Sequence, residues 1–255
     1  MQGFCPLASG SSGNCVFFGT VGAKILIDAG ISCKRIEERL SSINVDVKDI
    51  DAVLITHEHM DHIAGLKVLC SRYDIPLIAN AETARSICRI FNTRFRFKIF
   101  TSNEPFVFQN FKIHPFSIQH DAADPVGFII YANKWKLGYC ADLGFASTLV
   151  LKHLEDCDYL YLEFNHVVNM VHASNRPEGN KQRILGRQGH LSNEAAANAL
   201  KTVCRSNLKR VYLAHLSAEC NHPDLASQCA TAALGDGVEI VIARRREASL
   251  PVFFE

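Results

Sequence analysis

The sequence predicts an α/β protein with two mixed β-sheets that are flanked by helices. Short β-rich runs alternate with helical stretches from one end of the 255-residue chain to the other. Strand runs occur in both halves with helices between them, which favours two sheets packed face to face and covered by helices. No linker composition or low-complexity tract divides the chain, so we expect a single domain over residues 1–255.

The N-terminal half predicts three strands, each followed by a helix. Apolar, β-branched runs predict the strands, and apolar spacing of three and four residues predicts the helices. The expected strands are Lys24–Asp28, Ala52–Thr56 and Pro76–Ala79. The expected helices are Lys34–Leu40, Ile63–Tyr73 and Glu82–Phe91.

The middle of the chain is predicted to consist mainly of strands, and helices and strands alternate again after it. The expected strands are Phe106–Phe108, Phe111–Ile118, Val126–Ala132, Lys136–Cys140, Tyr159–Glu163, Arg210–Ala214, Val238–Ala243 and Pro251–Phe254. The expected helices are Ser147–His153, Asn193–Cys204 and Leu225–Leu234. The polar segment Val167–Arg187 has no clear period, so we expect a long loop with a functional role there.

Composition narrows the class of protein. The net charge of +1 argues against nucleic-acid binding through bulk charge but leaves room for a local basic patch. The ten cysteines are scattered and form no C-x-x-C pair, so we expect reduced thiols and a cytoplasmic protein. We recognise no signal peptide, and no run reaches the roughly 20 apolar residues that a membrane helix needs.

A histidine cluster follows the second predicted strand. The run T-H-E-H-M-D-H (Thr56–His62) places three histidines and a carboxylate within six residues. Open α/β sheets carry their sites at the carboxyl ends of strands, where these side chains can point the same way. Neutral imidazole and carboxylate are ligands of Zn²⁺, Mn²⁺ or Fe²⁺. The cluster therefore predicts a metal site.

The pattern H-x-H-x-D-H resembles the signature of the metallo-β-lactamase superfamily at every position, and I-D-A-G (Ile27–Gly30) is similar to an upstream motif of that superfamily. The resemblance implies a four-layer αβ/βα sandwich with metals at one sheet edge. It also implies a later His, Asp and His, each at a strand end. His120, Asp142 and His215 follow predicted strands in that order.

By this resemblance, two divalent metal ions bind in the site. One is held by His57, His59 and His120. The other is held by Asp61, His62 and His215, and Asp142 bridges the two. Asp at this bridging position, rather than Cys, is typical of esterase and phosphodiesterase branches. Zn²⁺, Mn²⁺ and Fe²⁺ fit such a set, and a hard carboxylate bridge also admits Mg²⁺.

Further motifs resemble the WalJ/YycJ branch of the superfamily, which consists of metal-dependent exonucleases acting on DNA. They are L-A-S-G-S-S-G-N (Leu7–Asn14), H-D-A-A-D-P-V-G (His120–Gly127), E-F-N-H (Glu163–His166), G-H-L-S-N (Gly189–Asn193) and L-A-H-L-S (Leu213–Ser217). The resemblance implies a phosphodiesterase with a DNA substrate. One departure is Val167, where that branch usually has Asp.

Roles outside the metal set follow from the same motifs. We expect Asp61 to orient the attacking water as well as bind metal, and His166 or His190 to give a proton to the leaving oxygen. Ser12 and Asn14 are candidate phosphate contacts, although their loop could be only a tight turn. Ser192 is a third candidate, and it could equally cap the following helix.

Other functions on the same metal site stay open. A small-molecule esterase, lactonase or thioester hydrolase is consistent with the neutral charge of the chain. A diiron redox protein of this fold would carry Glu in place of His59, and a non-catalytic scaffold would not need all seven ligands. The sequence does not indicate an oligomeric state.

Overall fold

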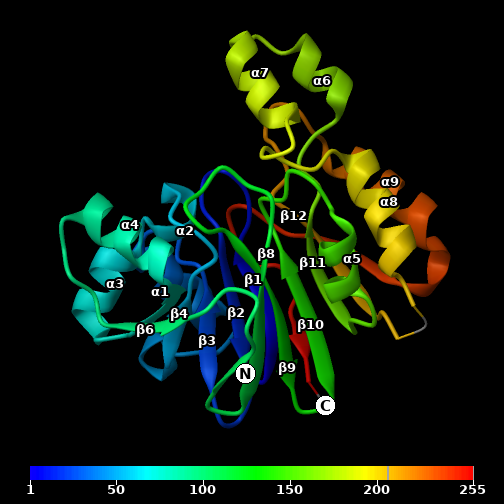
Figure 1. Cartoon of the computed structure of the whole chain (residues 1–255). Coiled ribbons are helices and arrows are strands. Elements are labelled where there is room, and N and C mark those ends of the chain that lie inside the picture. Colours follow the sequence, from blue (N-terminus) through cyan, green and yellow to red (C-terminus); the bar gives the residue numbers. More distant parts are fainter. Residues whose placement is uncertain (206, 255) are drawn as a thin grey trace. The chain divides into compact units, whose positions relative to one another are not determined.

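The computed structural model describes residues 1–205 and 207–254, which contain two seven-stranded sheets (Figure 1). The chain divides into two compact units. Unit 1 comprises residues 1–111, 122–124 and 243–254 of the described chain, and unit 2 comprises residues 112–121 and 125–242. Each unit has its own hydrophobic core. The expectation of a single domain stays a prediction.

The sheet of unit 1 has the strand order β14-β1-β2-β3-β4-β5-β6. Its strands are β1 (Gly3–Ala8), β2 (Cys15–Gly19), β3 (Lys24–Ile27), β4 (Ala52–Leu54), β5 (Leu77–Asn80), β6 (Phe97–Phe100) and β14 (Val252–Phe253). Strands β1, β2, β3 and β14 pair antiparallel, whereas β3 to β6 are parallel. The carboxyl ends of β3, β4 and β5 therefore meet at one edge of the sheet.

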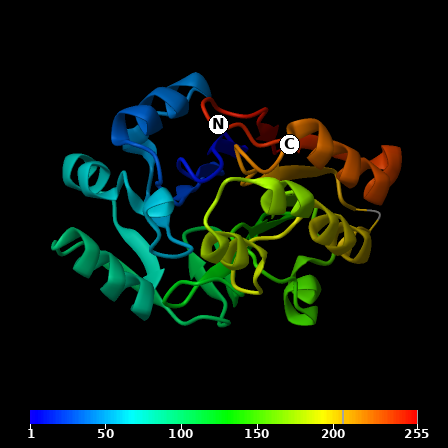
Figure 2. The same ribbon diagram turned by 90° about the horizontal axis from the view of Figure 1, so that it is seen from above.

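Helices line one face of this sheet (Figure 2). They are α1 (Cys33–Ser42), α3 (Leu66–Tyr73) and α4 (Ala81–Phe91), with the short α2 (Met60–Ile63) and the 3-10 turn η1 (Val47–Asp49) between strands. Local capping fixes where two helices start. The Ser32 hydroxyl accepts the Arg35 N–H at 3.4 Å, and the Asn80 side chain accepts the Thr83 N–H at 2.9 Å.

The second sheet has the order β13-β12-β11-β10-β9-β8-β7. Its strands are β7 (Phe106–Phe108), β8 (Phe111–Ser117), β9 (Val126–Ala132), β10 (Trp135–Cys140), β11 (Tyr159–Glu163), β12 (Arg210–Ala214) and β13 (Glu239–Ile242). Strands β10 to β13 are parallel, and β9 pairs antiparallel with β10. Their carboxyl ends form a second edge suited to a site.

Unit 2 contains α5 (Thr148–Leu154), α8 (Asn193–Val203) and α9 (Pro223–Leu234), which lie on one face of its strands, and the turn η2 (Gly235–Gly237) (Figure 2). Two further helices, α6 (Val168–Ala173) and α7 (Glu178–Leu185), extend beyond the strand ends of this unit (Figure 1). The long loop expected at Val167–Arg187 was therefore wrong. Helix α7 buries no side chain, so its sequence has no apolar period to reveal it.

The expected fold class is confirmed, since both sheets are mixed and carry flanking helices. Strands β1, β2 and β6 were not predicted from the sequence. Strands β1 and β2 are buried along their whole length, so they lack the alternation of apolar and polar residues that marks a half-exposed strand. In the described residues, no helix has the length and apolar character needed to span a membrane.

Candidate metal centre

The H-x-H-x-D-H motif begins after β4 and extends into α2 in unit 1. His57 and His59 stand on the loop, and Asp61 and His62 on α2. His57 Nε2 lies 3.1 Å from His59 Nδ1, and the ring centroids of His57 and His62 are 4.1 Å apart. The rings of the motif therefore lie close together, and an imidazole nitrogen that carries no proton can offer its lone pair to a cation.

A buried carboxylate orients His62. Asp28 follows β3 and is fully buried. It accepts the backbone N–H and the hydroxyl of Thr56, each at 2.9 Å, and its Oδ2 lies 2.7 Å from His62 Nδ1. Because an ionised carboxylate only accepts hydrogen bonds, Nδ1 of His62 carries the proton and Nε2 keeps its lone pair. Such carboxylate–histidine pairs are typical second partners of metal-ligating histidines.

Asp28 also orients His57, through a hydrogen-bond chain that passes over the Thr56 hydroxyl. The Thr56 hydroxyl donates to Asp28, and its oxygen lies 3.0 Å from His57 Nδ1. Nδ1–H of His57 therefore donates to Thr56, which leaves Nε2 as the acceptor atom. One buried carboxylate thus sets the tautomers of two histidines.

The Gly10–Asn14 loop contacts the motif from the other side. The Asn14 amide nitrogen lies 3.2 Å from Asp61 Oδ2 and 3.0 Å from His62 Nε2, and the Asn14 N–H donates to the Asp61 carbonyl at 2.7 Å. At Gly30, a Cβ would lie 1.6 Å from that same carbonyl oxygen, so only glycine fits. Asn14 is fully buried, whereas Ser12 is exposed. Their phosphate contacts stay predictions.

The second group of site residues stands at the strand ends of unit 2. Asp142 follows β10, Glu163 ends β11 and His215 follows β12. Asp142 and His215 each have a left-handed backbone, with φ of 54°, which turns the chain immediately beyond its strand. Asp142 Oδ1 lies 3.0 Å from His215 Nδ1.

Glu163 connects this group. It is fully buried, and its Oε1 lies 2.7 Å from His190 Nδ1 and 3.0 Å from His215 Nδ1. Its Oε2 accepts the backbone N–H of Leu143 at 2.7 Å and of Leu191 at 3.1 Å. Glu163 therefore orients two histidines and also fixes the two loops that carry Asp142 and His190. Glu163 thus orients the histidines of this group, as Asp28 orients the histidines of the motif in unit 1.

His120 completes the set in unit 2. Its Nδ1–H donates to the Gly189 carbonyl at 3.1 Å, so its Nε2 keeps the lone pair. Nε2 lies 4.0 Å from Asp142 Oδ1, and the ring centroids of His120 and His190 are 5.3 Å apart. Both lengths are compatible with side chains that approach one ion without bonding directly to each other.

The two candidate proton donors differ in environment. For His190, burial lowers the pKa, but the adjacent Glu163 carboxylate outweighs it and the pKa is raised overall. For His166, burial dominates and lowers the pKa to about 4. Its Nδ1 is buried without a hydrogen-bond partner in the described structure. His166 is therefore neutral at pH 7 in the metal-free protein.

Ser192 caps α8. Its hydroxyl accepts the Ala195 N–H at 3.1 Å, and its backbone pairs with that of His166. The cap expected from the sequence is present. A phosphate contact at Ser192 stays a prediction.

The donor atoms of unit 2 fit a metal ion. One atom each of Asp142, Glu163, His190 and His215 lies within 4.8 Å of the others. Imidazole nitrogens and carboxylate oxygens suit Zn²⁺, Mn²⁺ and Fe²⁺. Each unit therefore carries its own group of His and carboxylate side chains of the kind that hold metal ions.

Sequence reasoning missed Asp28 and Glu163 as orienting residues. Both belong to motifs that are recognisable in the sequence, Ile27–Gly30 and Glu163–His166, but neither was predicted to have a role of its own. The available signal was an acidic residue at the end of an apolar strand or directly after it, where burial makes an unpaired carboxylate costly.

Comparisons with known proteins agree with this geometry. The family model described as beta-lactamase superfamily domain matches residues 23–216. Exodeoxyribonuclease YycJ of Bacillus anthracis is 36% identical over 226 residues, which cover 88% of this chain and 85% of the relative. Exodeoxyribonuclease WalJ of Streptococcus pneumoniae is 36% identical over 248 residues, which cover 92% and 91%.

Solved structures agree on the fold. The metallo-beta-lactamase fold protein YhfI of Bacillus subtilis superposes with a TM-score of 0.75 at 17% identity, covering 96% of this chain and 98% of that one. Zn²⁺-bound PqqB of Methylobacterium extorquens gives 0.71 at 15% identity, covering 98% and 100%. The chain is a hydrolase of this fold with a His/Asp metal site. It belongs to the metallo-β-lactamase superfamily, together with the YycJ and WalJ proteins that it resembles over most of its length.

Proposed function

We propose that this protein is a metal-dependent phosphodiesterase that acts as an exonuclease on DNA. The observation that carries the proposal is the similarity over most of the chain to two relatives named exodeoxyribonucleases. The two groups of histidines, each oriented by a buried carboxylate, support a hydrolytic metal centre. A cytoplasmic location accompanies this proposal.

The proposed ligands are the seven residues expected from the sequence: His57, His59, Asp61, His62, His120, Asp142 and His215. Two ions of Zn²⁺, Mn²⁺ or Fe²⁺, or alternatively Mg²⁺, would lower the pKa of a bound water and offset charge on the phosphate. Glu163 and His190 lie close enough to Asp142 to support this set or to contribute to it.

The protein's own residues divide the remaining work. Asp28 and Glu163 hold the histidine tautomers, so the rings need not reorganise during the reaction. Asp61, fixed by Asn14, orients the attacking water. Of the two candidate proton donors, His166 and His190, the second is favoured to protonate the leaving oxygen, because the pKa of His190 is raised whereas His166 is neutral at pH 7. Ser12, Asn14 and Ser192 are the proposed phosphate contacts.

The test is cleavage of end-labelled linear duplex DNA by protein that has been stripped of metal. Mn²⁺, Mg²⁺ or Zn²⁺ is added back separately, and Asp61→Ala is compared with the exposed-site control Asp236→Asn. We expect metal-dependent shortening from one end, lost in Asp61→Ala and kept in the control. The direction of shortening gives the strand polarity.

The second candidate is a small-molecule esterase, lactonase or thioester hydrolase on the same metal site. The nearly balanced charge of the chain is the observation that favours it. Absence of DNA cleavage with every metal, together with turnover of a small ester or lactone, would replace the first proposal by this one.

A further inference from the structure

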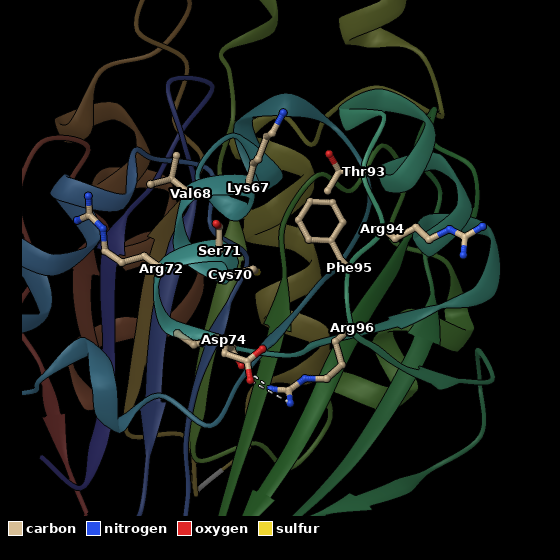
Figure 3. Close-up of a pocket in the computed structure, with 11 residues that line it drawn as sticks. Lys67, Val68, Cys70, Ser71, Arg72, Asp74, Thr93, Arg94, Phe95 and Arg96 are labelled. Carbon is tan, nitrogen blue, oxygen red and sulfur yellow. Dashed lines mark hydrogen bonds and ion pairs between the residues drawn. The ribbon is translucent and has the colours of Figure 1, made fainter.

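A cavity of about 630 Å³ lies in unit 1, apart from the histidine motif, between α3 and the segment that joins α4 to β6 (Figure 3). Four basic residues line it: Lys67, Arg72, Arg94 and Arg96. The ring of Phe95 lies between Lys67 and Arg94 (Figure 3). The cavity therefore combines cationic groups with an apolar wall.

The charge of this region departs from that of the whole chain. Residues 67–98 contain seven basic and only two acidic side chains, although the net charge of the protein is +1. A local excess of this kind produces a positive potential that the overall balance hides. Phosphate-bearing ligands are the class that such a potential attracts.

Two of the four cavity cations are neutralised within the protein. Arg72 binds Glu37 at 2.7 Å, and Arg96 lies 3.3 Å from Asp74. Lys67 and Arg94 are exposed, and neither forms an ion pair with any described residue. These two side chains are therefore available to a ligand without breaking an existing pair.

The cavity lies close along the chain to the proposed metal ligands. Lys67 stands on the first turn of α3, five residues after His62. Five residues span at most about 18 Å. One strand of DNA rises about 3.4 Å per nucleotide, so this distance corresponds to about five nucleotides.

We propose that this cavity binds the sugar-phosphate backbone of DNA within about five nucleotides of the hydrolysed end. Lys67 and Arg94 contact successive phosphates, and the Phe95 ring packs against the sugar between them. The inference rests on the proposed function. It assigns to the cavity the retention of the substrate strand during exonucleolytic cleavage.

The test measures binding without cleavage by the metal-loaded, full-length protein. The probe is a fluorescein-labelled 20-base-pair duplex whose linkages are phosphorothioates, and the readout is fluorescence anisotropy over a range of salt concentrations. The double variant Lys67→Ala/Arg94→Ala is compared with Arg35→Ala/Lys48→Ala. The control also removes one lysine and one arginine from exposed positions of unit 1.

We expect the Kd of the first variant to rise about tenfold at low salt. The slope of log K against log salt should become shallower by about 1.8, because each lost phosphate contact contributes about 0.9. The control should bind like the unmodified protein.

The outcomes separate this inference from the proposed function. If the unmodified protein digests ordinary DNA but the first variant keeps its affinity and salt slope, the cavity is not the contact and the exonuclease proposal stands. An equal loss in the control would also overturn the inference, because binding would then depend on total charge. If the unmodified protein neither binds nor cleaves DNA, both proposals fail.

Discussion

The two groups of candidate ligands are built in opposite ways. In unit 1, His57, His59, Asp61 and His62 come from six consecutive residues on one loop and one helix. In unit 2, the corresponding residues, His120, Asp142 and His215, are dispersed over nearly one hundred positions and follow the ends of three strands. Both groups nevertheless contain a fully buried carboxylate that orients two histidines, Asp28 in one and Glu163 in the other.

Asp28 and Glu163 differ in how many separate segments of the chain their hydrogen bonds connect. Asp28 acts on residues whose backbone a short loop already positions, and it makes its contacts through Thr56 and His62. Glu163 binds two histidines and two backbone N–H groups from three separate segments. A dispersed site therefore depends on one buried charge for its assembly, whereas a contiguous motif depends mainly on its own loop.

The largest expected effect is the loss of Glu163. Glu163→Ala leaves two buried N–H groups and two histidines without their acceptor, which should lower the free energy of unfolding by about 3–5 kcal/mol. Urea unfolding of the metal-free protein measures this loss. Asp28→Ala is the comparison, and we expect a smaller loss there. Equal losses would remove the distinction between the two groups.

The second-largest expected effect concerns His166. This histidine is buried in unit 2, and the motif of unit 1 has no counterpart to it. Its pKa of about 4 lies below the usual value of 6.5 because burial disfavours the charged ring. The unfolded chain therefore binds more protons between these pH values, so stability is full above about pH 6.5 and falls as pH drops toward 4. The loss should approach about 3 kcal/mol.

Urea unfolding between pH 7 and pH 4 in the presence of EDTA tests this expectation. His166→Gln cannot titrate, so its stability should fall less steeply with acid than that of the unmodified protein. The exposed-histidine variant His222→Gln serves as the control and should keep the original slope. Parallel curves for all three proteins would show that His166 is not held neutral.

The contrast between contiguous and dispersed residues also separates what could be predicted from the sequence from what could not. The strands around the contiguous motif and its ligand types could be predicted from local pattern. His120, Asp142 and His215 needed a family resemblance, because nothing local links them. The orienting roles of Asp28 and Glu163 depend on tertiary contacts between segments far apart in the sequence, and helix α7 has no apolar face from which to predict it.

A smaller effect tests whether Asp28 serves the metal rather than the fold. Asp28→Asn keeps the shape of the side chain but weakens the acceptor for His62 Nδ1, so affinity for one ion should fall about 10–100-fold. Competition with a chromophoric chelator measures this affinity, and Asp236→Asn serves as the exposed control. Unchanged affinity would mean that the loop alone positions His62.

The smallest effect separates the two roles of Ser192. Ser192→Ala removes the cap of α8 and should cost about 1 kcal/mol of stability, similar to Ser147→Ala at the start of α5. If Ser192 also contacts a phosphate, its variant alone should raise the KM for DNA several-fold, whereas Ser147→Ala should leave KM unchanged. Equal KM values for both variants would reduce Ser192 to a cap. The dispersed group would then consist of its histidines and carboxylates, with no hydroxyl from the start of α8.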